Sequence, residues 1–292
     1  MQGTGRIFAG MAGVALALAV TVAASILVVR CVMPLQQMME AQPHRAVYDL
    51  NLDHASSDGG VTGLEGRMVV EWRGGPACEG YTSEQRVVTK STDDTGRVSV
   101  SDVRLSAWES VDGNEFRFDR TEYTDGVLGT QEFGKAKRRD GKVVLELEYG
   151  DPIELPPDVL FPTAFNAELT KAIARGKSSY VHLLFDGAQK YATNVTAFIG
   201  KKEQPAGAAG LIPIKNAPEG VSLAQMKERT LHISYFDLDP EVQADTADTA
   251  PSFEMDQSVF PNGVMGNLKL IYEDASINGV LKDIEYFKPG SC

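Results

Sequence analysis

The stretch EFRFDRTEYTDGVLGTQEFGKAKRRDGKVVLELEY, residues 115–149, decides the fold class of this chain. Apolar and polar residues alternate along its runs, which is the period-2 pattern of half-buried strands. Asp125-Gly126 and Asp140-Gly141 separate the runs, and an Asp-Gly pair readily takes the positive φ values of a tight hairpin turn. The stretch therefore predicts antiparallel hairpins, because parallel strands need much longer connections.

The same pattern continues on both sides of this stretch. Further strands are predicted at residues 67–72, 97–108, 178–185, 191–200, 231–236, 253–260, 267–277 and 280–287. Turns are predicted at residues 94–96, 112–113, 186–187, 262–263 and 278–279, where Asp or Asn stands with Gly. The chain is thus mainly β, and we expect an antiparallel curved sheet with one or two short helices, closed by a disulfide.

One helix is predicted after the proline-rich residues 151–162, from Asn166, which can cap it, to Arg175, with Gly176 ending it. Leu169, Ala172 and Ile173 share one face, so the helix should lie on the sheet as a plug or lid. A shorter second helix is predicted from Ser222, where Ser-Leu-Ala-Gln matches a capping box.

Residues 201–220 are rich in Pro, Gly and Ala, and they read either as a linker or as a long surface excursion. A linker would favour two domains. We favour one continuous curved sheet over residues 42–292, because a disulfide between the first hairpins and the last strand would tie the two halves together.

An uncharged apolar run covers residues 7–29, with Arg6 before it and Arg30 after it. It is long for a cleaved signal and long enough to span a bilayer, so residues 1–41 are either a signal peptide or a retained signal anchor. Both alternatives place residues 42–292 outside the cytoplasm, either released after cleavage or tethered to the membrane. Cys31 either is removed with the signal peptide or lies at the membrane edge. Lipid attachment at Cys31 is not expected, because a lipidation motif needs a small residue immediately before the cysteine and Arg30 stands there.

The exported part then keeps two cysteines, Cys78 and Cys292. An even count in an oxidising compartment predicts that they form a disulfide. Their separation of 214 positions makes this bond worth about 5 kcal/mol in the loop-entropy view.

The chain has a net charge of −12 and a pI near 4.9. Most of its surface would therefore repel the phosphate groups of a nucleic acid, and we expect no nucleic-acid partner. The densest basic run, residues 135–139, leads into a turn and reads as a solvated strand end.

No chemical activity, metal or cofactor is predicted. Residues 129–136 approach a phosphate-binding loop, but Ala136 stands where a magnesium-binding hydroxyl is needed and no helix follows. The four histidines lack zinc-site spacing, and His182 and His232 read as face-alternating strand residues. Asp237, Asp239 and Glu241 resemble a calcium loop only in part, since Pro240 interrupts them.

Several strings together resemble the EipB family of bacterial cell-envelope integrity proteins. They are residues 48–72, Cys78-Glu79-Gly80-Tyr81, residues 155–163 ending in Phe161-Pro162-Thr163, Phe185-Asp186-Gly187, Ile233-Ser234-Tyr235-Phe236 and Cys292. The resemblance covers nearly all of the exported part. It implies a large periplasmic β-spiral, a curved open-barrel sheet with Cys78 bonded to Cys292, similar in outline to periplasmic lipoprotein carriers. The protein would be soluble in the periplasm after cleavage, or tethered to the inner membrane by a retained anchor. The resemblance supplies no catalytic residues. The chain departs from the family pattern at Phe165, where the family tends to have histidine, and at Ala188, where it tends to have serine.

Three functions follow as hypotheses. The first is a non-enzymatic binding or scaffold protein whose partners are envelope proteins, a tetratricopeptide-repeat periplasmic protein being the kind that suits the resemblance. The second is a carrier that binds a lipid or a lipoprotein acyl chain on the concave face of the sheet. The third, a carboxylate hydrolase, has no distinctive pair of acidic residues to support it.

Overall fold

A computed structural model describes residues 41–292, apart from 57–59, 76, 239–249 and 289–290. The predicted export segment, Cys31, Asp239 and Glu241 lie outside these described residues. Ala41–Cys292 forms one compact unit. Within the described ranges, no helix combines the length and the apolar character that a bilayer crossing requires.

Fifteen strands form one sheet. They are β1 (His44–Ala55), β2 (Val61–Gly74), β3 (Gly80–Asp93), β4 (Val98–Ser110), β5 (Glu115–Thr124), β6 (Val127–Arg139), β7 (Lys142–Leu147), β8 (Ile153–Leu155), β9 (Ser179–Leu184), β10 (Thr193–Pro205), β11 (Ile214–Lys215), β12 (Lys227–Asp237), β13 (Phe253–Val259), β14 (Met265–Ile271) and β15 (Ala275–Tyr286). The helix α2 spans Pro162–Ala174, and the 3-10 turns η1 and η2 span Gly207–Leu211 and Leu223–Gln225.

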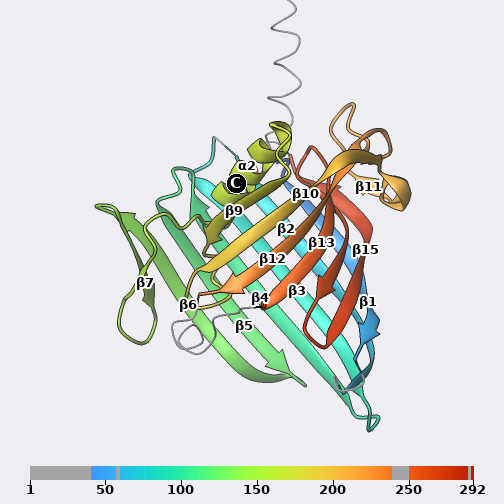
Figure 1. Ribbon diagram of the computed structural model, residues 1–292, viewed down its shortest axis with the longest axis horizontal. Coiled ribbons are helices and arrows are strands. Elements are labelled where there is room, and N and C mark those ends of the chain that lie inside the picture. The colour runs from blue at the N-terminus through green and yellow to red at the C-terminus, as the bar shows by residue number, and fades with distance from the viewer. Residues whose placement is uncertain (1–40, 57–59, 76, 239–249, 289–290) are drawn as a thin grey trace, which may run out of the picture. The chain divides into compact units, whose positions relative to one another are not determined.

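The sheet is continuous from β8 through β1 and β15 to β9, in the order β8-β7-β6-β5-β4-β3-β2-β1-β15-β14-β13-β12-β10-β9. Its long pairings are all antiparallel, as the hairpin turns predict. The first strand lies beside the last one in the middle of this order, so β8 and β9 form the two edges of the sheet. Figure 1 shows β12 and β13 in front of β2, β3 and β4. The predicted single curved sheet is therefore confirmed.

Among the described residues, the backbones at the two edges of the sheet are joined by one β-bridge. Leu160, beyond β8, makes a parallel bridge to Leu184 of β9, with its N–H donating to the Leu183 carbonyl at 2.9 Å and its carbonyl accepting from Phe185 at 2.9 Å. A single bridge joins these two edges, so the barrel is almost closed rather than continuous.

One face of the sheet, here called the inner face, carries the core. Tyr48, Met68 and Phe116 point to it and are buried. A first core cluster surrounds Tyr48 on β1 and β15, a second one is aromatic and includes Phe116, and a third one lies beneath α2. The opposite face is called the outer face.

The disulfide Cys78–Cys292 joins the β2–β3 connection to the residues after β15, with a Cα–Cα distance of 5.6 Å. It confirms the predicted pairing. Nearby, Gly74 donates its N–H to the Ser291 carbonyl at 3.1 Å, and the guanidinium of Arg73 lies 3.6 Å from the centroid of the Phe287 ring. The bond therefore fixes a corner that backbone and side-chain contacts also hold.

Three local predictions are wrong. The helix α2 begins at Pro162 instead of Asn166, because Pro fits the first helical position and needs no N–H partner there. The helix predicted from Ser222 is only the 3-10 turn η2, and the Ser222 side chain makes no capping hydrogen bond. Asn278-Gly279 lies inside β15, where Gly279 leaves room for Leu268, and the turn before β15 lies at residues 272–274 instead.

The predicted linker is structured at both ends. β10 runs on to Pro205, and β11 adds to β15 in parallel at Ile214 and Lys215. Ala206 and Ala209 are buried in the first core cluster. Residues 201–220 are therefore an excursion that packs against the sheet, which explains why they do not separate two domains.

Candidate functional site

Three of the predicted motif strings converge on the N-terminus of α2. Gly80 and Tyr81 begin β3, and their neighbours across β4 are Ser110 and Glu109. A Cβ atom on Gly80 would lie 2.5 Å from the Trp108 side chain, so only glycine leaves room there. Glu79 itself is exposed. The segment that contains Phe161, Pro162 and Thr163 packs against this end of the sheet, where Glu109 contacts it.

Glu109 caps the helix from a distant strand. Its carboxylate accepts the backbone N–H of Thr163 at 2.6 Å and that of Ala164 at 3.0 Å. Glu109 is only 4% exposed, and burial raises its pKa even though the two N–H groups favour the charged form. A buried carboxylate at the positive end of the helix dipole thus anchors α2 to β4.

An aromatic cluster lies next to this anchor, on the inner face. Phe161 stacks on Phe116 with 5.3 Å between ring centroids. Phe185 meets Phe116 and Phe118 edge-on, at 5.9 Å from each. All four rings are buried, so the apolar strand residues here form core, and Phe161 and Phe185 serve packing.

Asp186-Gly187 makes a tight turn against the same cluster. The Asp186 carboxylate accepts the Ala188 N–H at 2.9 Å, and burial raises the pKa of Asp186. Gly187 has φ +79°, and a Cβ atom there would lie 2.5 Å from Phe118. Burial also raises the pKa of Tyr235, and the neighbouring Asp186 carboxylate raises it further.

The string Ile233-Ser234-Tyr235-Phe236 divides between two faces, because strand residues alternate. Ile233 is buried beneath α2, and Tyr235 packs beside it. Ser234 is hydrogen-bonded to Glu254 on the neighbouring β13. Tyr235 thus lies near Asp186, whereas Ser234 faces the other side of the sheet, so the motif as a whole does not form one site.

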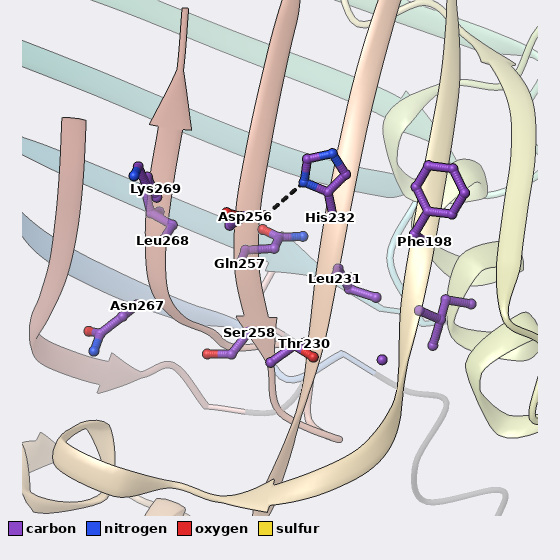
Figure 2. Close-up of a pocket in the computed structure, with 12 residues that line it drawn as sticks. Phe198, Thr230, Leu231, His232, Asp256, Gln257, Ser258, Asn267, Leu268 and Lys269 are labelled. Carbon is purple, nitrogen blue, oxygen red and sulfur yellow. Dashed lines mark hydrogen bonds and ion pairs between the residues drawn. The ribbon is translucent and has the colours of Figure 1, made fainter. Parts of the chain in front are cut away.

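A groove of about 590 Å³ crosses the outer face over β10, β12, β13 and β14. We call it the outer groove. Figure 2 shows Phe198, His232, Asp256 and Lys269 in one row, with Thr230, Ser258 and Asn267 in the next. The backbone registers place Phe198 opposite His232, His232 opposite Asp256, and Asp256 opposite Lys269.

His232 in the outer groove lies between two carboxylates. Its Nδ1 is 2.7 Å from Asp256 and its Nε2 is 3.2 Å from Glu254. The hydrogen bond to Asp256, with the charge of Glu254, raises the pKa of His232, so both ring nitrogens carry protons in the charged form.

Ser234, His232 and Asp256 resemble a catalytic triad in order, with the serine oxygen 3.4 Å from the imidazole Nε2. The geometry does not activate the serine. Its hydroxyl donates to Glu254 at 3.0 Å, and Nε2 is turned to the same carboxylate. Ser234 is also only 5% exposed, so this group is best described as a cross-strand polar network.

A second hollow, of about 540 Å³, lies on the outer face of β3, β4 and β5. Arg86 and Arg104 both donate to Asp102 through bonds of 2.7–3.3 Å, which lower the Asp102 pKa. Val98, Val100 and Leu128 are exposed beside it, at 47%, 39% and 48%. We call Arg86, Val98, Val100, Arg104 and Leu128 the outer patch.

The other candidates from sequence are placed as follows. Residues 129–136 lie within β6, paired to β5 and β7. The basic run is not simply solvated, because Lys135 and Lys137 pair with Glu115 and Arg138 donates to the carbonyls of Pro157 and Val159. His182 and His232 lie in strands as predicted. Among the described residues, no three His, Cys, Asp or Glu side chains are grouped so that they can hold a metal ion.

Sequence reasoning missed Glu109 and the pair Arg86–Arg104. The acidic residue in Ala107-Trp108-Glu109 falls at an inner-face position of its strand, and this break in the alternation was the available signal.

A model of the family described as EipB-like matches residues 35–288. The chain is 33% identical over 253 residues to the cell envelope integrity protein EipB of Brucella abortus, covering 85% of each chain. It also resembles the crystal structure of a β-barrel-like protein of a domain of unknown function from Brucella abortus, with a TM-score of 0.77 and 29% identity, over 86% of this chain and all of the other.

Proposed function

Because the chain belongs to the EipB-like family, we propose that it is an exported, non-enzymatic protein that supports cell-envelope integrity by binding other envelope proteins. The name of the Brucella abortus relative supports the envelope role. The apolar segment at residues 7–29 supports export to the periplasm.

The observation that carries the proposal is the outer patch. Large apolar side chains that stay exposed together mark protein-binding surfaces more often than isolated ones do. Val100 lines the same hollow as the guanidinium groups of Arg86 and Arg104, and arginine is enriched at interfaces. Val98 lies two positions before Val100 on β4, and Leu128 is paired with Tyr123, which also lines the hollow. Arg86 and Arg104 share the carboxylate of Asp102, and the Asp125 carboxylate accepts the Val100 N–H at 2.7 Å, so charges of both signs surround the apolar side chains. The patch suits a protein partner with an apolar centre and a rim that also carries both signs of charge.

Acidic substitutions at the apolar residues of the outer patch test this role. Val100→Glu together with Leu128→Glu should weaken the envelope, measured as growth in detergent and entry of a large dye, in cells that carry the variant as their only copy. Val181→Glu is the control, because Val181 is an exposed strand residue on β9, distant in the sheet. Equal envelope function in both variants, at equal protein levels, would contradict the proposal.

The carrier function is the second candidate. It is favoured by Met255 and Val259, which are only partly buried on the inner face next to the third core cluster, where an acyl chain can contact them. Native mass spectrometry of protein purified without detergent tests it. A lipid adduct would favour the carrier, and protein without any adduct would contradict it.

A further inference from the structure

The charged groups of the outer groove are all paired within the sheet. His232 faces Asp256 and Glu254, and the ammonium of Lys269 lies 2.7 Å from Asp53. An anionic ligand such as a phosphate would find no cation without an acidic partner. Each of the three carboxylates already accepts from His232 or Lys269, so the groove suits a ligand without net charge.

The shape of the groove comes from glycine and from strand spacing. A Cβ atom on Gly200 would lie 2.2 Å from the Thr230 hydroxyl, and one on Gly266 would lie 2.1 Å from the Ser258 hydroxyl. Because neither glycine has a side chain, the outer face is hollowed at these two positions. The groove crosses four neighbouring strands, a distance of about 14 Å at the usual strand spacing. It is long enough for several units of an extended chain.

The lining offers one apolar platform and several hydrogen-bonding groups. Phe198 is 53% exposed, and its ring lies 6.2 Å from that of His232, tilted by 30°. Asn267 accepts the Leu281 N–H at 3.0 Å, which orients its amide and leaves the NH2 group to donate. Asp256 binds His232 through one oxygen, so its second oxygen remains an acceptor.

From these features we propose that the outer groove binds an extended, uncharged glycan chain. The apolar face of a sugar ring stacks on the exposed Phe198 ring, as amphipathic rings do on aromatic side chains. The hydroxyl groups along the chain then bond to Thr230, Asp256 and Asn267. This site goes beyond the proposed protein scaffold, and it does not depend on the outer patch.

Isothermal titration calorimetry of the full chain with N-acetylchitotetraose tests the site, in a zwitterionic detergent that has no sugar headgroup. The tetramer should bind saturably and at least about tenfold more tightly than the monomer N-acetylglucosamine, because the groove spans four strands. Phe198→Ala should weaken the binding by about tenfold. Thr230→Val, which keeps the side-chain shape, should also weaken it measurably.

The matched control is Phe133→Ala, which removes another exposed outer-face phenylalanine, on β6. It should leave the affinity unchanged. The proposal is overturned if the tetramer does not bind, if monomer and tetramer bind equally, or if Phe198→Ala and Thr230→Val both bind like Phe133→Ala.

Discussion

The carboxylate of Glu109 on β4 accepts the backbone N–H of Thr163 at 2.6 Å, across 54 positions of sequence. A helix usually takes its cap from the residue just before it, but α2 has Phe161 at that position and no side-chain cap of its own. The sheet therefore supplies the cap, and formation of α2 depends on β4 being in place.

Removal of this cap should destabilise the whole protein. Glu109→Ala leaves two N–H groups of α2 unpaired in a buried site, which we expect to lower the free energy of unfolding by about 1–3 kcal/mol. Urea unfolding followed by circular dichroism measures it. Glu84→Ala removes an exposed outer-face glutamate of β3 and should change stability by less than about 0.5 kcal/mol. Equal losses in the two variants would contradict the capping role.

The cross-strand network at His232 should make stability depend on pH. The pKa of His232 is raised in the folded protein, so the proton adds stability that is fully present below the unfolded value of 6.5 and is lost as pH rises through the folded pKa. Histidine resonances in NMR should place the midpoint for His232 above 6.5, and Asp256→Asn should move it down. A midpoint at or below 6.5 in the wild type would rule out the network as described.

The turn at Gly187 should tolerate no side chain. Gly187→Ala must accept a positive φ and place Cβ against Phe118. Gly141→Ala is the matched control, because its φ is +77° and nothing lies within 4 Å. We expect a cost of about 1 kcal/mol at Gly141, from the backbone alone, and about 1–3 kcal/mol more at Gly187, from the added steric clash. Similar unfolding midpoints for the two variants would show that the turn relaxes freely.

Loss of the disulfide should cost the chain about 5 kcal/mol in the loop-entropy view, less any relief of native strain. The double variant Cys78→Ser with Cys292→Ser tests it. Hydrogen exchange should rise first in residues 286–288 and at the start of β3, where the bond holds the corner. If hydrogen exchange in these two segments of the double variant were the same as in the wild type, the disulfide would not hold this corner.

The hairpin half of the fold is predictable from sequence because its signals are local. Asp125 and Asp140 adopt positive φ together with the following glycines, so those two turns were correct in type and place. Alternating apolar residues then fix which face is inside.

The missed features depend on contacts between distant residues. The start of α2 at Pro162 is capped by Glu109, more than fifty positions before it, and no local side-chain cap announces it. Gly279 resembles a turn residue but serves close packing against Leu268. The outer groove arises only when β10, β12, β13 and β14 align, so its lining residues share no motif in the sequence.

Photo-crosslinking in living cells tests the central claim, protein binding at the outer patch, most directly. A photoreactive amino acid at position 100 should capture one or a few envelope proteins reproducibly, identified by mass spectrometry, while the same group at position 181 should not capture them. Capture of no protein from position 100, or of the same proteins from both positions, would contradict the account.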